Sequence, residues 1–329
     1  MPTPAMAPVS TRPAISVVLP VFNAGRYLRA ALDSLAAQTC RDFEVIAIDD
    51  GSTDRSGAVL DAYARRDGRF RIFHQANAGI VDALNAGLAR ARGEFIARMD
   101  ADDEATPGRF AAQLARLRAE PGLVALGSAV TLIDAGGNPV KSLGRPLAHA
   151  AIERALLAGD GGAMIHPAVM FRARAVREAG GYRSQAAHVE DLDLFLRLAR
   201  LGGLANLPEA GLRYRVHPQS INFTRNRGRQ ATRLAVLREA WEARGLAFDP
   251  ARFPDDFARY ADPANHHREW SVTSLAFGSR RVAVGHGWRA VRLSPRDPAS
   301  WRALRYALTA PFPDLSARDL PASRHHLHA

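Results

Sequence analysis

Residues 15–49, ISVVLPVFNAGRYLRAALDSLAAQTCRDFEVIAID, contain the unit from which the fold can be predicted. The stretch begins and ends with short apolar runs, ISVVLP and FEVIAID, whose β-branched residues are typical of buried strands. Between these runs, Leu28, Leu32 and Leu35 fall on one face of a helix. Strand, helix and strand in this order indicate parallel strands joined by a helix that covers the sheet.

The same alternation continues along the chain. Apolar runs at 70–74 and 94–100 predict two more strands, and GSTDRSGAVLDAYARR and GIVDALNAGLARARG predict the helices that precede them. We therefore predict an α/β fold with a mostly parallel, Rossmann-like central sheet flanked by helices. Further on we expect helices over 106–120, 150–158 and 190–202 and strands over 122–134, 168–172 and 211–217.

The C-terminal part of the chain is predicted to be helical from about residue 225. Residues 279–308 resemble one helix-turn-helix unit of the tetratricopeptide type, and a single unit is too short for a solenoid, so we expect a docked extension. The predicted organisation is a disordered lead-in over 1–13, a main domain over 14–220 and a helical, basic extension over 221–329.

Cysteine usage and hydropathy indicate the compartment. The single cysteine, Cys40, excludes internal disulfides and suits a reducing environment. The longest apolar stretch, 122–133, is shorter than the ~20 residues of a membrane-spanning helix. Residues 1–13 lack the charged and then apolar layout of a secretory signal. We expect a cytoplasmic protein.

The net charge of +11 is concentrated in the tail, where 20 arginines and no lysines face 10 acidic residues from Leu212 onward. Basic segments favour anionic surfaces. We expect the tail to bring the protein to an anionic membrane, at the inner face of the plasma membrane, with RNRGR and SRR as contacts and with no nucleic-acid partner. The alternative is that these arginines are solvated helix faces.

Polar clusters follow each of the first four predicted strands, namely PVFNAG, DDGSTD, QANAG and DADD. Ligands of parallel α/β sheets bind beyond the carboxyl ends of the strands. A single aspartate at such an end is usually a helix cap, but four clusters at corresponding ends predict one shared cleft.

The glycine pattern and the DADD cluster narrow the ligand of this cleft. The sequence has no G-x-G-x-x-G after the first strand and no G-x-x-x-x-G-K-[ST], which argues against a dinucleotide oxidoreductase and a P-loop NTPase. Asp100 and Asp102 could share a divalent cation, and Mn²⁺ or Mg²⁺ prefer such oxygen ligands together with substrate phosphates. The cation would also remove the repulsion within DADD.

Four segments occur together in the order found in family 2 glycosyltransferases, which residues 14–220 resemble. They are ISVVLPVFNAGRYLRAALDSLAAQTCRDFEVIAIDDGSTD, NAGIVDALNAGLARARGEFIARMDADD, HVEDLDLFLRLA and YRVHPQS. The resemblance implies a GT-A fold, a nucleotide-sugar donor, a divalent metal and inversion at the anomeric carbon. It divides the main domain into a nucleotide-sugar-binding half, 14–104, and an acceptor half, 105–220.

The resemblance also assigns residues to the donor site. Pro20, Phe22 and Asn23 would line the pocket for base and ribose, and Asp50 would bind the nucleobase imide. Asn77, in the QANAG cluster, is a further predicted substrate contact.

In RMDADD, Asp102 would hold the metal on the diphosphate, and Asp100 would lie near the ribose or the metal. Arg98 would approach the diphosphate or simply pair with Asp100. Asp103 is either a substrate contact or the cap of the helix that begins near Pro107.

The acceptor half contains the predicted general base. An acceptor hydroxyl needs a carboxylate to take its proton, whereas the metal stabilises the leaving diphosphate. Asp191 matches the family's base, and Glu190 would position the acceptor, although two acids at a helix start can also serve the helix dipole alone. His166 would lie in the acceptor site or be structural. His217 would contact the diphosphate or act as a further metal ligand.

We therefore predict a metal-dependent inverting glycosyltransferase of the hexosyl- or N-acetylhexosaminyltransferase type. It would move a sugar from a UDP-linked donor to a glycan or lipid-linked acceptor during synthesis of a cell-envelope or surface polysaccharide. One rival is a sugar nucleotidylyltransferase, which would open on a glycine-rich loop with a basic residue, both missing from LPVFNAG. The other is a catalytically inactive glycosyltransferase-like scaffold, which the presence of Asp50, Asp100, Asp102 and Asp191 argues against.

Overall fold

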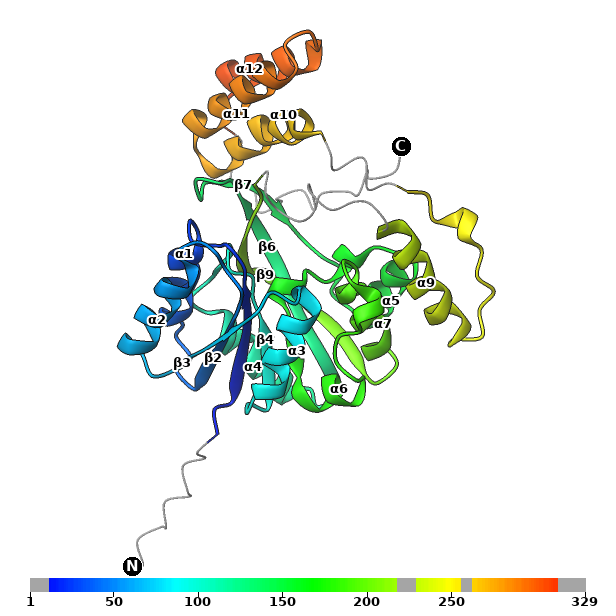
Figure 1. Ribbon diagram of the computed structural model, residues 1–329. Helices are drawn as coiled ribbons and strands as arrows, with labels where there is room; N and C mark the ends of the chain where they lie inside the picture. The colour runs from blue at the N-terminus through cyan, green and yellow to red at the C-terminus, as the bar shows by residue number, and fades with distance from the viewer. Residues whose placement is uncertain (1–11, 218–228, 256–261, 313–329) are drawn as a thin grey trace, which may run out of the picture.

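The computed structural model describes residues 12–217, 229–255 and 262–312 (Figure 1). The lead-in predicted over 1–13, most of the RNRGR segment and the final RHHLHA lie largely or wholly outside these ranges. Within the described ranges, no helix is both long and apolar enough to cross a lipid bilayer.

The first four strands form the parallel part of the sheet, as the alternation predicts. β1 (Ile15–Val21) pairs in parallel with β2 (Phe43–Asp50) and with β4 (Phe95–Arg98), and β2 pairs in parallel with β3 (Phe70–Gln75). β1 and β2 are buried along their whole length. Both faces of the sheet are covered, because Ile15, Val17, Leu19 and Val21 of β1 belong to one hydrophobic cluster and Val18, on the opposite face, belongs to a second one. The connecting helices are α1 (Leu28–Ala36), α2 (Ser56–Arg66) and α3 (Ile80–Arg90).

α3 packs unusually close to β1. A Cβ atom added at Gly87 of α3 would lie 2.5 Å from Cγ1 of Val18. This position therefore needs a residue without a side chain, and the close approach fixes the helix on the sheet.

The second half of the sheet is mixed. β8 (Met170–Arg172) runs antiparallel between β4 and β6 (Leu123–Ile133), and β6 pairs in parallel with β9 (Gly203–Arg215). The short strands β5 (Glu104–Ala105) and β7 (Pro139–Leu143) join β9 and β6 antiparallel, which completes a nine-stranded sheet. The α/β fold class is confirmed, but parallel pairing is limited to β1–β4 and β6–β9. Alternating strands and helices cannot predict this, because β8 is reached through loops that let the chain reverse.

The helices of the second half cover this mixed part of the sheet. α7 begins at Glu190, and the apolar residues of its buried side include Leu192, Phe195 and Leu196. Its first turn is therefore held at a fixed place, where Glu190 and Asp191 are partly exposed and Asp193 is buried. The others are α4 (Arg109–Ala119), α5 (His149–Leu157) and α6 (Ala173–Glu178).

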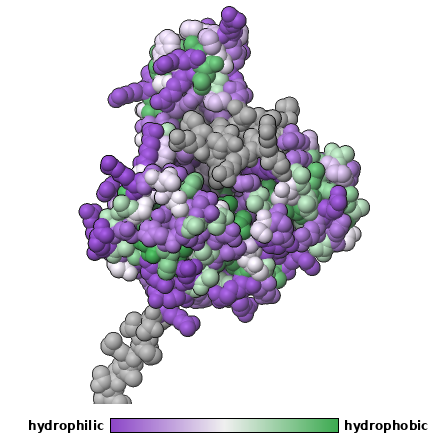
Figure 2. Space-filling view, in the orientation of Figure 1, coloured by the Kyte–Doolittle hydropathy of each residue, from purple (hydrophilic) through white to green (hydrophobic). Residues whose placement is uncertain are grey.

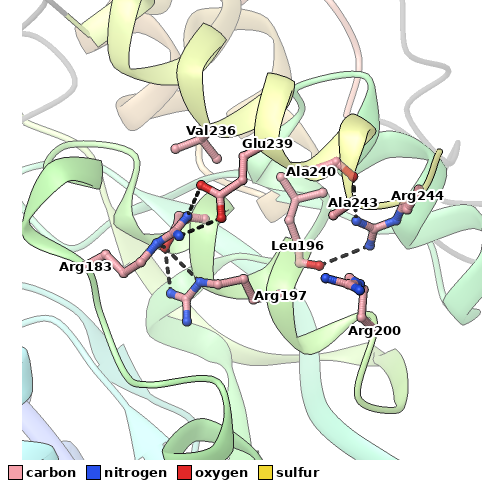
Figure 3. Close-up of a pocket in the computed structure, with 10 residues that line it drawn as sticks. Arg183, Leu196, Arg197, Arg200, Val236, Glu239, Ala240, Ala243 and Arg244 are labelled. Atoms are coloured by element: carbon pink, nitrogen blue, oxygen red, sulfur yellow. Dashed lines mark hydrogen bonds and ion pairs between the residues drawn. The ribbon is translucent and has the colours of Figure 1, made fainter. Parts of the chain in front are cut away.

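α9 (Arg229–Glu242) is fastened to α7 by charged side chains (Figure 3). Arg183 reaches both Glu239, at 2.7 Å, and the buried Asp193 of α7. Arg197 lies 2.6 Å from the same aspartate. The depression between the two helices is therefore an ion-pair network behind α7, and not the cleft predicted from the strand ends.

The last helices form a small bundle beyond β7 (Figure 1). They are α10 (Pro263–Thr273), α11 (Arg280–Leu293) and α12 (Pro298–Thr309). α11 and α12 are the hairpin that residues 279–308 predict. The side chains of Asp262, Ser279 and Asp297 cap the three helices. The boundaries of the domains stay a prediction.

Candidate active site

Hydrogen bonds join the loops at the carboxyl ends of β1, β2 and β3. Asn23 adopts a left-handed conformation with φ of 51°, and its Oδ1 accepts the backbone N–H groups of Thr53 and Asp54. The N–H of Asn23 donates to Oγ of Ser52. Pro20 is buried within β1, and the Phe22 side chain is 49% exposed beside this junction. An exposed aromatic ring on an ordered loop can stack on a base, so the predicted donor pocket has a suitable wall here.

Asp50 organises the loop after β3. Its Oδ1 accepts the side-chain amide of Gln75 and the N–H of Ala78, and its Oδ2 accepts the N–H of Gly79. Asn77, which is exposed, donates its side-chain amide to the Asp50 carbonyl. The structure thus gives Asp50 a local role that sequence reasoning missed, and its contact with a nucleobase stays a prediction.

The acidic loop after β4 gathers carboxylates closely enough to hold a cation. One oxygen each of Asp100, Asp102 and Asp103 lie within 4.8 Å of one another. Asp103 is 1% exposed, and its Oδ1 accepts the N–H of Arg215 at 2.7 Å. Its Oδ2 finds no hydrogen-bond partner among the described residues. Such an orphaned buried oxygen fits a site completed by a metal ion.

The pKa values of this loop point the same way. Burial raises the pKa of Asp103 well above its ordinary value, and the charges of Asp102 and Asp100 add to the rise. Burial also raises the pKa of Asp100, although the nearby Arg98 opposes it. A divalent cation would remove this strain, since it favours the ionised form of every carboxylate around it.

The two open alternatives for this loop are decided by contacts. Arg98 Nη1 lies 2.5 Å from Oδ2 of Asp100, so the pairing alternative is observed, and any approach of Arg98 to a diphosphate stays a prediction. Asp103 does not cap the next helix, because α4 begins after Gly108 and no side chain of the described residues caps it there. The cap interpretation of Asp103 was wrong, since the carboxylate turns inward to β9 instead.

His217 closes the acidic cluster from the end of β9. Its Nε2 lies 3.0 Å from Oδ2 of Asp102, and its ring packs against Tyr27 with centroids 4.8 Å apart. Imidazole nitrogen and carboxylate oxygen can share one divalent cation. Asp100, Asp102 and His217, the predicted ligands, are therefore brought together with Asp103, although their role as ligands is a prediction.

The predicted base lies at the first turn of α7. Asp191 Oδ1 accepts the N–H of Leu192 at 2.7 Å, and burial raises the pKa of Asp191. Burial and the charge of Asp191 together raise the pKa of Glu190 to about 7. Oε2 of Glu190 is buried with no hydrogen-bond partner in the described part of the chain. The charge of Asp191 also adds to the rise in the pKa of Asp100, which is mainly due to burial.

His166 supports the wall of this site from within. It is 6% exposed, and its Nε2 lies 2.7 Å from the hydroxyl of Tyr182. Its ring packs edge-on against Phe171 and Phe195. Burial and the charge of Arg98 hold the pKa of His166 well below its ordinary value. These contacts match the structural alternative, and a contact of His166 with the acceptor stays a prediction.

Sequence reasoning missed Arg215, which contacts the acidic loop from β9. Its Nε donates to the carbonyl of Asp102 at 2.7 Å, and its guanidinium lies over the ring of Tyr27. The arginine is placed two residues before His217 in YRVH, but it is 111 positions from Glu104, its ion-pair partner at 2.5 Å. Because the two residues are so far apart along the chain, no local sequence pattern could predict that they form an ion pair.

A parallel β-α-β half with carboxylates at its strand ends, joined to a mixed half that carries an acidic helix start, defines a protein with the GT-A fold. Residues 16–180 match the model of glycosyl transferase family 2. An uncharacterized glycosyltransferase of Haemophilus influenzae is 32% identical over 69% of this chain and 73% of its own length. The chain belongs to glycosyl transferase family 2.

Further likenesses are partial. The chondroitin synthase of Escherichia coli is 26% identical over 71% of this chain, and the match covers 33% of that protein's own length. For another curated relative, the match covers 28% of the relative's own length. The structure of Staphylococcus aureus TarS residues 1–349 in complex with UDP-GlcNAc matches with a TM-score of 0.58 at 15% identity, covering 89% of this chain and 90% of that one. This last likeness supports the fold.

Proposed function

We propose that this protein is a metal-dependent inverting glycosyltransferase that transfers a sugar from a UDP-linked donor to an acceptor hydroxyl. The observation that carries the proposal is the carboxylate cluster after β4, where one oxygen each of Asp100, Asp102 and Asp103 lie within 4.8 Å of one another and Oδ2 of Asp103 has no hydrogen-bond partner among the described residues. A base and a diphosphate-binding metal site must lie on either side of one anomeric carbon for a single displacement.

In the proposed reaction, Asp191 takes the proton of the acceptor hydroxyl. The acceptor oxygen forms its bond to the anomeric carbon while the bond from that carbon to the diphosphate oxygen breaks. The electron pair leaves with the diphosphate, so the configuration inverts. Asp100, Asp102, Asp103 and His217 would hold Mn²⁺ or Mg²⁺, which when bound supplies positive charge for the leaving group.

The choice of donor and acceptor rests on relatives. The UDP-GlcNAc bound to TarS motivates a UDP-linked hexose or N-acetylhexosamine as donor. Chondroitin synthase, matched over 71% of this chain, motivates a polysaccharide acceptor, which we assign to the cell envelope. The polar junction around Asn23 and the exposed ring of Phe22 would bind the nucleoside.

A thermal-shift screen tests the donor. The protein is heated with UDP-, GDP- and TDP-sugars, each with and without Mn²⁺, because a ligand that binds the native state raises the melting temperature by mass action. We expect the largest rise with a UDP-sugar plus Mn²⁺ and its loss in Asp102→Asn. If a GDP-sugar gave the largest rise, the donor would be assigned as GDP-linked and not UDP-linked. If no nucleotide sugar raised the melting temperature, the inactive glycosyltransferase-like scaffold would be favoured.

We further propose that the helical bundle contacts an anionic lipid surface through a Trp–Arg face. The face consists of exposed residues at helical spacing on α11 and α12. The Trp288 and Trp301 rings meet with centroids 6.2 Å apart, so the two stripes are continuous. Arginine beside tryptophan suits the headgroup region of an anionic bilayer. The members are Arg281, Trp288 and Arg292 of α11 and Trp301, Arg305 and Leu308 of α12.

This proposal differs from the expectation based on RNRGR and SRR, because most of RNRGR lies outside the described residues. Of the SRR segment, Arg280 donates to the carbonyls of Ala307, Leu308 and Ala310 at the end of α12, so it is occupied within the bundle. The visible surface of the bundle is mainly hydrophilic (Figure 2). Interfacial binding and not insertion is therefore the expected mode.

Liposome flotation tests the membrane contact. The parent should float with vesicles that contain anionic lipid and stay behind with neutral vesicles, and Trp288→Ser with Trp301→Ser should lose flotation. Tyr306→Ser, which changes an exposed aromatic of α12 outside the face, is the control and should float like the parent. Equal recovery with neutral vesicles, or an undiminished double variant, would contradict the proposal.

A further inference from the structure

Arg215 contacts three consecutive residues at the acidic loop, Asp102, Asp103 and Glu104. Its backbone N–H donates to Oδ1 of Asp103 and its Nε to the carbonyl of Asp102, both at 2.7 Å. Its Nη2 lies 2.5 Å from Oε1 of Glu104. The side chain is 4% exposed, so these contacts are made away from solvent. One arginine therefore holds consecutive residues of the acidic loop in register.

The remaining arm of the guanidinium points to the turn after β6. Nη1 of Arg215 donates to the carbonyl of Asp134 at 3.1 Å. A Cβ atom added at Gly137 of the same turn would lie 3.5 Å from this nitrogen. The turn itself is closed by the Asp134 carboxylate, which accepts the N–H groups of Gly136 and Asn138. The arginine thus rests on a rigid turn.

The helical bundle fixes this turn from the other side. His286 of α11 is 1% exposed, and its Nε2 lies 3.2 Å from Oδ2 of Asp134. Behind it, Nδ1 of His286 lies 2.9 Å from Nδ1 of His267 on α10. At the adjoining strand β7, Lys141 lies 2.5 Å from Glu269 of α10. The bundle is therefore docked on the element that supports Arg215.

We infer that Arg215 is a positioning residue for the metal site, and that the helical bundle stabilises it through His286 and Asp134. The inference rests on the proposed function, because it concerns the metal that Asp100, Asp102, Asp103 and His217 would hold. Substitution of residues that orient metal ligands typically lowers metal affinity by about ten- to a hundredfold. The Arg215 side chain fixes the backbone of Asp102 through its carbonyl and pairs with Glu104, whereas the Asp103 carboxylate is held by the backbone N–H of residue 215. The test therefore concerns the side-chain contacts.

Direct titration of the full chain with Mn²⁺, followed by electron paramagnetic resonance, tests the inference without measuring activity. Arg215→Met should raise the Kd for Mn²⁺ about ten- to a hundredfold. Arg172→Met is the matched control, since Arg172 is also a mostly buried strand arginine that bonds backbone carbonyls, those of Leu117 and Leu123. The control should bind Mn²⁺ like the parent.

A second substitution keeps the test decisive if Arg215→Met does not fold. Arg215→Lys keeps the positive charge, but an ammonium group can make only some of the hydrogen bonds of the planar guanidinium. It should therefore still weaken Mn²⁺ binding, while the circular dichroism spectrum should remain unchanged. A folded Arg215→Lys or Arg215→Met protein with the parent's Kd would overturn the inference. A parent whose Mn²⁺ binding is absent, or unaffected by Asp102→Asn, would instead overturn the proposed metal site.

The contribution of the bundle is tested separately at His286. His286→Gln removes the imidazole beside Asp134 while the ligands and Arg215 remain. We expect a several-fold higher Kd for Mn²⁺, smaller than the effect of Arg215→Met, and a non-additive double variant, because both changes act through one chain of contacts. Parental Mn²⁺ affinity in a folded His286→Gln protein would show that the bundle does not support the site.

Discussion

At the scale of single residues, the proposed chemistry depends on two adjacent carboxyls at the start of α7. Asp191 must be ionised to accept a proton, yet burial raises its pKa. A base whose pKa lies nearer to neutrality takes a proton more readily than an ordinary carboxylate does. Burial therefore destabilises the charged form of the Asp191 carboxylate, and for the same reason makes this carboxylate a better general base.

Substitution of the base gives the first prediction. Asp191→Asn keeps the shape of the side chain but cannot take the proton, so kcat should fall about 10²–10⁴-fold with the donor Kd nearly unchanged. The measurement is release of UDP in the presence of acceptor. Asp82→Asn, which changes an acid in the first turn of α3, is the control and should keep parental kcat. An Asp191→Asn enzyme as active as the parent would refute the assignment of the base.

The second prediction concerns pH. Because the pKa of Glu190 is raised to about 7 and that of Asp191 is also raised, kcat/KM should fall as pH is lowered from 8 toward 5, when the pair takes up a proton. Glu190→Gln removes the neighbouring negative charge, so the acidic limb should move to lower pH. The check is a kcat/KM profile of both proteins. An unmoved limb would mean that the two carboxyls do not titrate together.

At the same scale, the sequence identified the acids but not their partners. The DADD cluster and ED pair are visible as local patterns. The contact that orders them, from Arg215 to Asp103, joins residues 112 positions apart. Asp103 itself had two open interpretations, which only the inward turn of its side chain could separate.

At the scale of elements, the contact between α3 and β1 depends on the size of one residue. The glycine in NAGLARARG reads as a mild weakness within a predicted helix, since glycine disfavours helix interiors. In the fold, a Cβ atom at Gly87 would lie 2.5 Å from Cγ1 of Val18. At this position, the need for close packing against β1 outweighs the low helix propensity of glycine.

A pair of glycine substitutions tests this contact. Gly87→Ala should lower the free energy of unfolding by about 1–3 kcal/mol, because the added methyl group overpacks against β1. Gly285→Ala, within α11, is the matched control, since a Cβ there meets no described atom within 4 Å. The control should be neutral or stabilising by up to about 1 kcal/mol. Urea unfolding measures both, and a Gly87→Ala protein as stable as the control would contradict the packing argument.

Some strands of the sheet do not follow the simple alternation of strand and helix along the chain. The parallel strands β1–β4 follow from helices placed between apolar runs. β8 enters the sheet antiparallel, and β5, with two residues, is too short for a pattern of alternating residues to be recognised. Such strands form because their neighbours offer unpaired backbone groups, which is a property of the assembled sheet.

At the scale of the whole molecule, acid should weaken the attachment of the helical bundle. Burial and the neighbouring His286 hold the pKa of His267 at about 4, below the ordinary value of 6.5. The unfolded chain then binds more protons than the folded one, so stability is complete above pH 6.5 and is lost as pH falls toward 4. For Asp134, burial alone would raise the pKa, but the contact with His286 and the bonds from Asn138 and Gly136 lower it. That contribution is lost at still lower pH.

Melting scans between pH 7.5 and 4.5 test this expectation. Trp270 packs edge-on against His267 and His286, so its contribution to the tryptophan fluorescence reports on the docked bundle. The melting temperature should fall with pH, and His267→Gln should reduce the slope between pH 6.5 and 4.5 because it removes that proton uptake. An identical slope in the two proteins would assign the acid sensitivity to other groups.

The sequence by itself determined the α/β class, the four strand-end clusters and membership of a glycosyltransferase family, because these depend on residues that are close along the chain. Only the tertiary structure decided the antiparallel entry of β8, the inward turn of Asp103 toward β9 and the link from the bundle through Asp134 to Arg215. These features join distant segments. Their geometry follows from how the whole chain buries its apolar surface while satisfying its buried polar groups.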